Sequence, residues 1–170
     1  AVAKGMGLDR RIGSQFLNVG PGYGGSCFPK DTLALIQTFE DFDLDNRIVK
    51  SVVDTNNFQK ERMIEKIVRS LEGGIAGKVI AVLGLTFKPE TDDMRDSPSL
   101  TILPALIEKE AKIRAHDPEG VDQAKKLLPD SIEYVSDIYE TAKNADAIIL
   151  MTEWNEYKVL DLELLKRKLK

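Results

Sequence analysis

The chain has 170 residues, of which 42% are hydrophobic and 31% are charged, and its formal net charge at pH 7 is −4. This composition is that of an ordinary globular protein and excludes a fibrous or a disordered chain. Outside the last predicted helix its basic residues alternate with acidic ones, and no apolar run approaches the roughly 20 residues that span a bilayer, so we expect neither a nucleic-acid partner nor a membrane.

Residues 1–72 carry helical patterns, interrupted by glycines at 18–26 and by an acidic break near 41–45. No convincing strand pattern occurs in this region. The spacing of apolar residues predicts a long amphipathic helix over 46–71, in which Asn56 and Asn57 could introduce a kink. A stripe of that length commonly packs on another helix, from the same chain or from a second subunit. Its apolar positions are Ile48, Val49, Val52, Val53, Met63, Ile64, Ile67, Val68 and Leu71.

Residues 73–170 alternate between two patterns, which predicts an α/β domain with a parallel sheet. Strands are predicted at 78–83, 112–116, 132–135 and 147–152, and helices at 98–110, 119–128 and 137–145. In such a doubly wound fold the ligand crevice lies beyond the carboxyl ends of the strands. We therefore predict two domains, a helical region over 1–72 and a Rossmann-like domain over 73–170, with a boundary at Gly73 and Gly74.

Both ends of the chain fall inside helical patterns. Residues 1–4 start such a pattern without Met or a capping residue, and residues 164–170 stay within another. We therefore expect the chain to be part of a longer enzyme.

The segment 20–31, GPGYGGSCFPKD, places the only cysteine in a glycine-rich turn before a helix. Pro29 suits the first helical position, so Cys27 would lie at the positive end of the helix dipole, where the dipole and Lys30 favour the reactive thiolate. Gly24 and Gly25 would let another molecule approach the backbone. The alternatives are that Cys27 is a small buried hydrophobe and that Lys30 and Asp31 are an exposed pair in the first turn.

The counts of cysteine and histidine limit the chemistry further. One cysteine forms no internal disulfide, and one cysteine with one histidine builds no zinc site, which favours a reducing, cytoplasmic location and a metal-free mechanism. Gly20, Gly22 and Gly25 match the G-x-G-x-x-G spacing, but a dinucleotide fingerprint requires a buried strand before it, and residues 14–19 are a poor candidate.

A second motif spans residues 84–98, where the chain leaves the first predicted strand and enters a helix. Ser97 suits the N-cap and Pro98 the first helical position, so free backbone N–H groups there, together with Lys88 and Arg95, could bind a phosphate. The alternative is a charged surface loop, since four acidic residues accompany the two cations. His116, after the second strand, is interpreted as structural, and Trp154 and Tyr157 as packing over the sheet edge.

Residues 24–31 together with 87–98 closely resemble the UDP-glucose/GDP-mannose dehydrogenase family, and the resemblance extends from Lys4 to Trp154. Phe28 favours the UDP-glucose branch within it. The resemblance implies a helical central dimerisation region followed by a UDP-binding domain. It also implies that NAD is the cofactor and that the C6 alcohol of a nucleotide sugar is oxidised twice, with UDP-glucose as the substrate and UDP-glucuronate as the product.

The resemblance also implies roles for individual residues. Cys27 would capture the intermediate aldehyde as a thiohemiacetal that is oxidised to a thioester, and Asp31 would assist the hydrolytic water. Lys30 and Arg95 match positions that contact NAD. The UDP-sugar would be held by Phe16, Leu17, Asn18, Val19, Gly20, Gly24 and Lys88, with Arg11 reaching the substrate of a neighbouring subunit in a homodimer.

Parts of the family pattern are absent from these 170 residues. They are the N-terminal dinucleotide-binding domain with its catalytic glutamate, the lysine and asparagine on the helix that would precede Ala1, and a further arginine beyond Lys170. Because the resemblance implies that these parts are needed, we expect the chain to be inactive alone. Two other interpretations stay open, namely a GDP-mannose dehydrogenase and a noncatalytic module for nucleotide-sugar binding or dimerisation.

Overall fold

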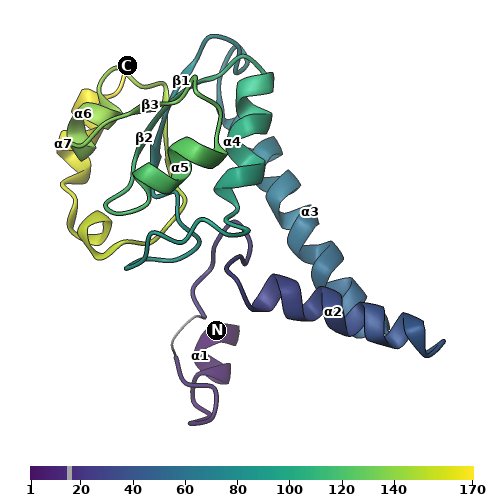
Figure 1. Ribbon diagram of the computed structural model, residues 1–170. Coiled ribbons are helices and arrows are strands. Elements are labelled where there is room, and N and C mark those ends of the chain that lie inside the picture. Colours follow the sequence, from purple (N-terminus) through teal and green to yellow (C-terminus); the bar gives the residue numbers. More distant parts are fainter. Residues whose placement is uncertain (15–16) are drawn as a thin grey trace.

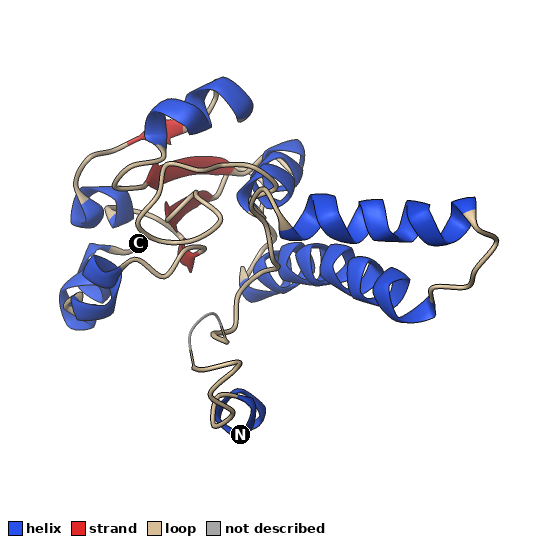
Figure 2. Cartoon of the chain, turned by 60° about the horizontal axis from the view of Figure 1, so that its bottom comes forward, coloured by secondary structure: helices blue, strands red, loops and turns tan. Residues whose placement is uncertain are grey.

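A computed structural model describes residues 1–14 and 17–170. Its N-terminal part is helical, with a short α1 (Val2–Met6) followed by a hairpin of α2 (Phe28–Asp41) and α3 (Arg47–Ser70). The hairpin projects away from the sheet, as both views show (Figures 1 and 2). At its tip Asn46 caps α3, because its side-chain oxygen accepts the Val49 amide at 3.1 Å.

The long helix α3 is continuous over its 24 residues and passes through Asn56 and Asn57 without a break. Its C-terminal half packs on α4 (Ser99–Glu108) and joins the core of the sheet through Met63, Ile64 and Ile67. Its N-terminal half leaves apolar side chains in solvent, since Ile48 is 81% and Phe58 61% exposed. One amphipathic helix thus connects the two parts of the chain.

The C-terminal part contains a sheet of four parallel strands in the order β3-β2-β1-β4, as the α/β prediction required. The strands are β1 (Val79–Leu83), β2 (Lys112–His116), β3 (Glu133–Tyr134) and β4 (Ala147–Leu150). The chain adds β2 and β3 on one side of β1 and then returns to add β4 on the other. The carboxyl ends of β1 and β4 therefore form the switch point at which such sheets bind ligands.

Short helices connect and follow the strands. They are α5 (Val121–Leu127), α6 (Ile138–Ala142), the 3-10 helix η1 (Asn155–Val159) and α7 (Leu162–Lys168). The main core lies between the sheet, α3 and α4, and includes the fully buried Ile80, Val82 and Leu103. Within the described part of the chain, no helix is long and apolar enough to cross a membrane.

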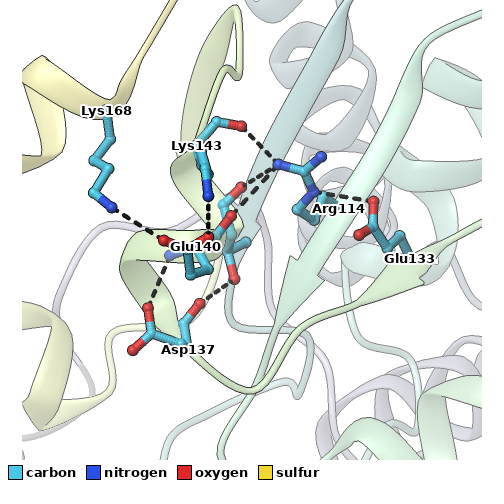
Figure 3. A network of polar contacts seen from close by, with 7 residues as sticks. Arg114, Glu133, Asp137, Glu140, Lys143 and Lys168 are labelled. Carbon is cyan, nitrogen blue, oxygen red and sulfur yellow. Dashed lines mark hydrogen bonds and ion pairs between the residues drawn. The ribbon is translucent and has the colours of Figure 1, made fainter.

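Arg114 on β2 ties the outer elements of the domain together (Figure 3). Its Nε donates to Glu133 Oε2 at 3.0 Å, and its guanidinium caps the end of α6 by donating to the Lys143 carbonyl at 2.7 Å. Glu140 on α6 in turn binds Lys143 and, across to α7, Lys168 at 3.0 Å. The network satisfies carbonyl groups that a helix C-terminus otherwise leaves without partners.

Candidate active site

Cys27 lies at the N-terminus of α2, as its N-cap residue. The helix begins at Phe28, so Pro29 occupies its second position and not the first one predicted. Cys27 is exposed, which is incompatible with the alternative of a packed, buried thiol. Its Sγ lies 3.6 Å from Ser26 Oγ, and its carbonyl accepts the Asp31 amide at 2.8 Å as the first bond of the helix.

Lys30 and Asp31 form an exposed ion pair in the first turn of α2. The pKa of Lys30 is raised mainly by its hydrogen bond to the Asp31 carboxylate, with a smaller contribution from the charge of Cys27. Lys30 therefore stays cationic and lies within electrostatic reach of the sulfur. An exposed pair of this kind contributes little to stability, so its importance is the charge that it brings to this end of the helix.

Arg95 comes from the second motif, and its guanidinium also interacts electrostatically with Cys27. Its guanidinium binds Asp93 through Nε at 2.9 Å and through a terminal nitrogen at 2.7 Å. The pKa of Arg95 is raised chiefly by Asp93 and, to a smaller extent, by the charge of Cys27. Conversely, Arg95 lowers the pKa of Asp93. Two cations from motifs about 65 residues apart in sequence thus both interact electrostatically with Cys27.

Close backbone packing joins the two motifs. The Gly25 amide donates to the Arg95 carbonyl at 2.7 Å. A Cβ on Gly24 would lie 2.4 Å from the Asp96 carbonyl oxygen, and one on Gly25, whose φ is +89°, would lie 2.7 Å from the Phe87 ring. The sequence predicted that another molecule would approach the backbone at these glycines, but the chain's own second motif occupies that space. We call this contact between Gly24 and Gly25 and the second motif the junction.

Asp117 fixes the loop that follows β1. It is 4% exposed, and its Oδ2 accepts the amides of Leu85 at 2.6 Å and Thr86 at 3.2 Å. The same oxygen accepts Trp154 Nε1 at 3.3 Å, and Oδ1 accepts the Gly120 amide at 2.6 Å. The contacts of the Asp117 carboxylate were not predicted from the sequence. The position of Asp117 directly after a buried strand is the signal that it holds the neighbouring strand end.

The start of α4 differs from the prediction. The helix runs from Ser99, with Pro98 as its N-cap, and Ser97 precedes it. The hydroxyls of Ser97 and Ser99 both donate to the Leu85 carbonyl at 2.6 Å, and Ser97 Oγ accepts the Ser99 amide at 3.3 Å. These buried hydroxyls fix the loop to the end of β1 and are not directed at a ligand.

The other residues predicted to bind the UDP-sugar near Cys27 are Lys88 and the segment 16–20. Lys88 is exposed, with its Nζ 5.4 Å from the centre of the Phe87 ring. Asn18 donates to Glu153 Oε1 at 2.9 Å, which holds its segment against the chain that follows β4. Leu17 is half-buried, and Val19 and Gly20 are exposed. Phe16 lies outside the described residues.

Arg11 is not brought to Cys27 by any described contact. It is paired within its own loop with Asp9, at 2.9 Å through Nε and 2.6 Å through a terminal nitrogen. Its side chain is 83% exposed. Arg11 therefore presents a fixed, solvated guanidinium on a loop next to α1.

Two hollows lie on the surface of the described residues near the two motifs. One, of about 720 Å³, lies along α3 between Tyr23, Ile48 and Gln59. The other, of about 520 Å³, lies beside the loop after β1 and is lined by Trp154 together with Glu90, Asp92, Glu119 and Asp122. Its carboxylates disfavour a phosphate. Among residues 1–14 and 17–170 no group of acidic, cysteine and histidine side chains is arranged to hold a metal ion.

Comparison of the sequence with known proteins identifies related domains and proteins. Residues 1–58 match the central domain, and residues 81–170 the UDP binding domain, of the UDP-glucose/GDP-mannose dehydrogenase family. The chain is 51% identical over 169 residues to a UDP-glucose 6-dehydrogenase of Rhizobium meliloti, covering 99% of the chain and 38% of that protein. It is 50% identical over 162 residues to UDP-glucose 6-dehydrogenase YwqF of Bacillus subtilis, covering 95% and 37%.

Solved structures give the same result. The fold resembles that of a UDP-glucose dehydrogenase from Pyrobaculum islandicum with a TM-score of 0.84 and 39% identity, over 94% of this chain and 37% of that one. The chain thus spans less than two fifths of the length of these relatives. With both family domains matched in order across most of its length, the chain belongs to the UDP-glucose/GDP-mannose dehydrogenase family.

Proposed function

We propose that this chain forms the cysteine-bearing and UDP-sugar-binding part of an NAD-dependent UDP-glucose 6-dehydrogenase, which oxidises UDP-glucose to UDP-glucuronate. The observation that carries the proposal is the convergence of Lys30 and Arg95, from separate motifs, on the exposed Cys27 at a helix N-terminus. Positive charge and a helix N-terminus both favour a thiolate, which is the nucleophilic form of cysteine.

In the proposed mechanism the Cys27 thiolate attacks the C6 aldehyde produced by the first oxidation, forming a C–S bond and a thiohemiacetal. Loss of a hydride from C6 and of the hydroxyl proton converts this adduct into a thioester. Water then attacks the thioester carbon, which releases the uronate and returns the thiol. Asp31, four residues after Cys27 and thus on the same face of α2, orients that water. NAD bound beside Lys30 and Arg95 would supply the hydride acceptor, with one NAD molecule consumed in each of the two oxidations.

The residues present suit an anionic cofactor. Lys30 and Arg95 are both exposed cations, and the charge of each interacts with that of Cys27, which fits the binding of a pyrophosphate in this part of the site. In the proposal they bind NAD, while Lys88, Gly24 and the segment 16–20 bind the UDP-sugar from the other side of the junction. The proposed division into domains follows the same line, with residues 1–72 as the central region and 73–170 as the UDP-binding domain.

We further propose that the enzyme is a cytoplasmic homodimer built on the hairpin of α2 and α3. Apolar side chains on the hairpin lie in solvent, including Leu33 at 56% and Phe42 at 73% exposed. Covering such a surface with a second copy removes apolar area from water. In the proposal Arg11, which is paired with Asp9 on an exposed loop, reaches across to the substrate of the partner.

Substrate identity is tested on the complete enzyme in which the chain occurs. Competition of unlabelled UDP-glucose and GDP-mannose for bound labelled UDP-glucose is expected to show displacement by UDP-glucose alone. Preference for GDP-mannose would instead assign the protein to the GDP-mannose branch. Lys88→Ala is expected to weaken binding of UDP-glucose more than binding of NAD, because Lys88 lies in the switch-point loop. An equal loss of both would contradict the assignment of Lys88.

A further inference from the structure

The side chain of Asn56 makes a reciprocal pair of hydrogen bonds with the backbone of the cysteine loop. Its Oδ1 accepts the Tyr23 amide at 2.8 Å, and its Nδ2 donates to the Tyr23 carbonyl at 3.3 Å. Asn56 lies in the middle of α3 and is half-buried, 33 residues away in sequence from its partner. Its amide therefore pairs with the loop in the way that a neighbouring strand would.

The loop lies tightly against this side chain. A Cβ on Gly22, whose φ is +146°, would be 2.9 Å from Asn56 Oδ1. On the opposite side of the loop, the Gly25 amide donates to the Arg95 carbonyl at 2.7 Å. The loop is thus held by α3 at Tyr23 and by the second motif at Gly25, two residues before Cys27.

Tyr23 transmits this restraint to the residue after the thiol. Its ring packs edge-on against the Phe28 ring, with centroids 4.7 Å apart and an interplanar angle of 71°. Phe28 is the first residue of α2 and follows Cys27 directly. Holding Tyr23 in place therefore fixes the start of α2, where the sulfur lies within the field of Lys30 and Arg95.

We infer that Asn56 is a positioning residue for Cys27, acting through Tyr23 and Phe28; the inference rests on the proposed function, in which Cys27 is the nucleophile. Asn56 touches no reacting atom in this account. Its role is to keep the thiolate at the place where the two cations and the sugar carbon meet, since a displacement of even about 1 Å in an active site costs about a hundredfold in rate.

The test compares Asn56→Ala with Asn57→Ala in the complete enzyme. Asn57 is the next residue of the same helix and is exposed, so its variant controls for a loss of helix stability. Alkylation of Cys27 by iodoacetamide at neutral pH, followed by mass spectrometry, is expected to slow about threefold or more in Asn56→Ala and to be unchanged in Asn57→Ala. We also expect kcat to fall about tenfold while KM for UDP-glucose stays within about twofold.

Equal alkylation rates and equal kcat values in the two variants would overturn the inference. If Asn56→Ala does not fold, Asn56→Asp decides by the same criteria, because it keeps the acceptor for the Tyr23 amide and loses only the donor. An alkylation rate of Asn56→Asp equal to that of Asn57→Ala would then overturn it. The alkylation comparison needs no turnover, so it is separate from the test of the proposed function, which fails if Cys27→Ala keeps its activity.

Discussion

Gly24→Ala tests whether the two motifs meet as tightly as the structure indicates. The added Cβ would lie 2.4 Å from the Asp96 carbonyl oxygen and 2.9 Å from its carbonyl carbon, whereas ordinary contacts begin at 3.4 Å. The obstacle is backbone, so no rotation of a side chain relieves it. The two segments must separate by about 1 Å, and such overpacking costs about 1 to 3 kcal/mol.

The separation also weakens the neighbouring hydrogen bond from the Gly25 amide to the Arg95 carbonyl. A bond of this kind contributes about 1 kcal/mol, so we expect Gly24→Ala to lower the free energy of unfolding by about 2 to 4 kcal/mol. Urea denaturation followed by circular dichroism measures this loss. Hydrogen exchange of the Gly25 amide reports the local opening and is expected to accelerate.

Gly20→Ala is the matched control in the same glycine-rich segment. A Cβ added there would have no atom within 4 Å, and the φ of Gly20 is outside the left-handed region. The free energy of unfolding is therefore expected to change by less than about 0.5 kcal/mol. If Gly24→Ala and Gly20→Ala unfold at the same urea concentration and Gly25 exchanges equally in both, the reasoning about the junction is refuted.

Three further predictions concern the UDP-binding part. Arg114→Ala is expected to lower the free energy of unfolding by about 1 to 3 kcal/mol, because the C-terminus of α6 loses the donor to the Lys143 carbonyl. Glu133→Gln removes only the ion pair of Arg114, so a loss in Arg114→Ala no larger than that in Glu133→Gln would contradict this. Tyr157→Phe removes a buried hydrogen bond of 2.7 Å to His116 Nδ1 and is expected to cost about 1 to 2 kcal/mol in urea denaturation; no loss would refute the role of the hydroxyl. The Val79 amide and Lys78 lower the pKa of Asp146, so its contribution to stability is present above the ordinary value of 3.8 and is lost as the pH falls below it. Asp146→Asn should accordingly reduce the acid dependence of unfolding relative to the unaltered chain, and an unchanged acid dependence would refute this.

The parallel sheet was predictable from sequence because its strands are short apolar runs separated by helical periodicity. β2 has the predicted bounds, since Lys112 to His116 lies between a helix end and Asp117. β3 is shorter than predicted, because this edge strand pairs only at Glu133 and Tyr134. The pattern of apolar residues indicates that a strand exists, but its ends depend on the neighbour with which it pairs.

The contacts of the candidate site were less predictable because they join distant segments. Asparagine side chains can compete locally with helical hydrogen bonds, but the Asn56 amide is used by Tyr23, which is 33 residues away in sequence. Gly24 and Gly25 were predicted to let another molecule approach the backbone, but Phe87 and Asp96 of the same chain are the groups that approach, and nothing in the local sequence indicates this.

The central claim is that Cys27 carries the sugar carbon during the second oxidation. The most direct measurement mixes the complete enzyme with UDP-glucose and NAD, quenches with acid within one turnover, and analyses the Cys27 peptide by mass spectrometry. We expect a UDP-glucuronyl thioester on Cys27 and no UDP-glucuronate from Cys27→Ala. Release of UDP-glucuronate by Cys27→Ala at the rate of the unaltered enzyme would contradict the account.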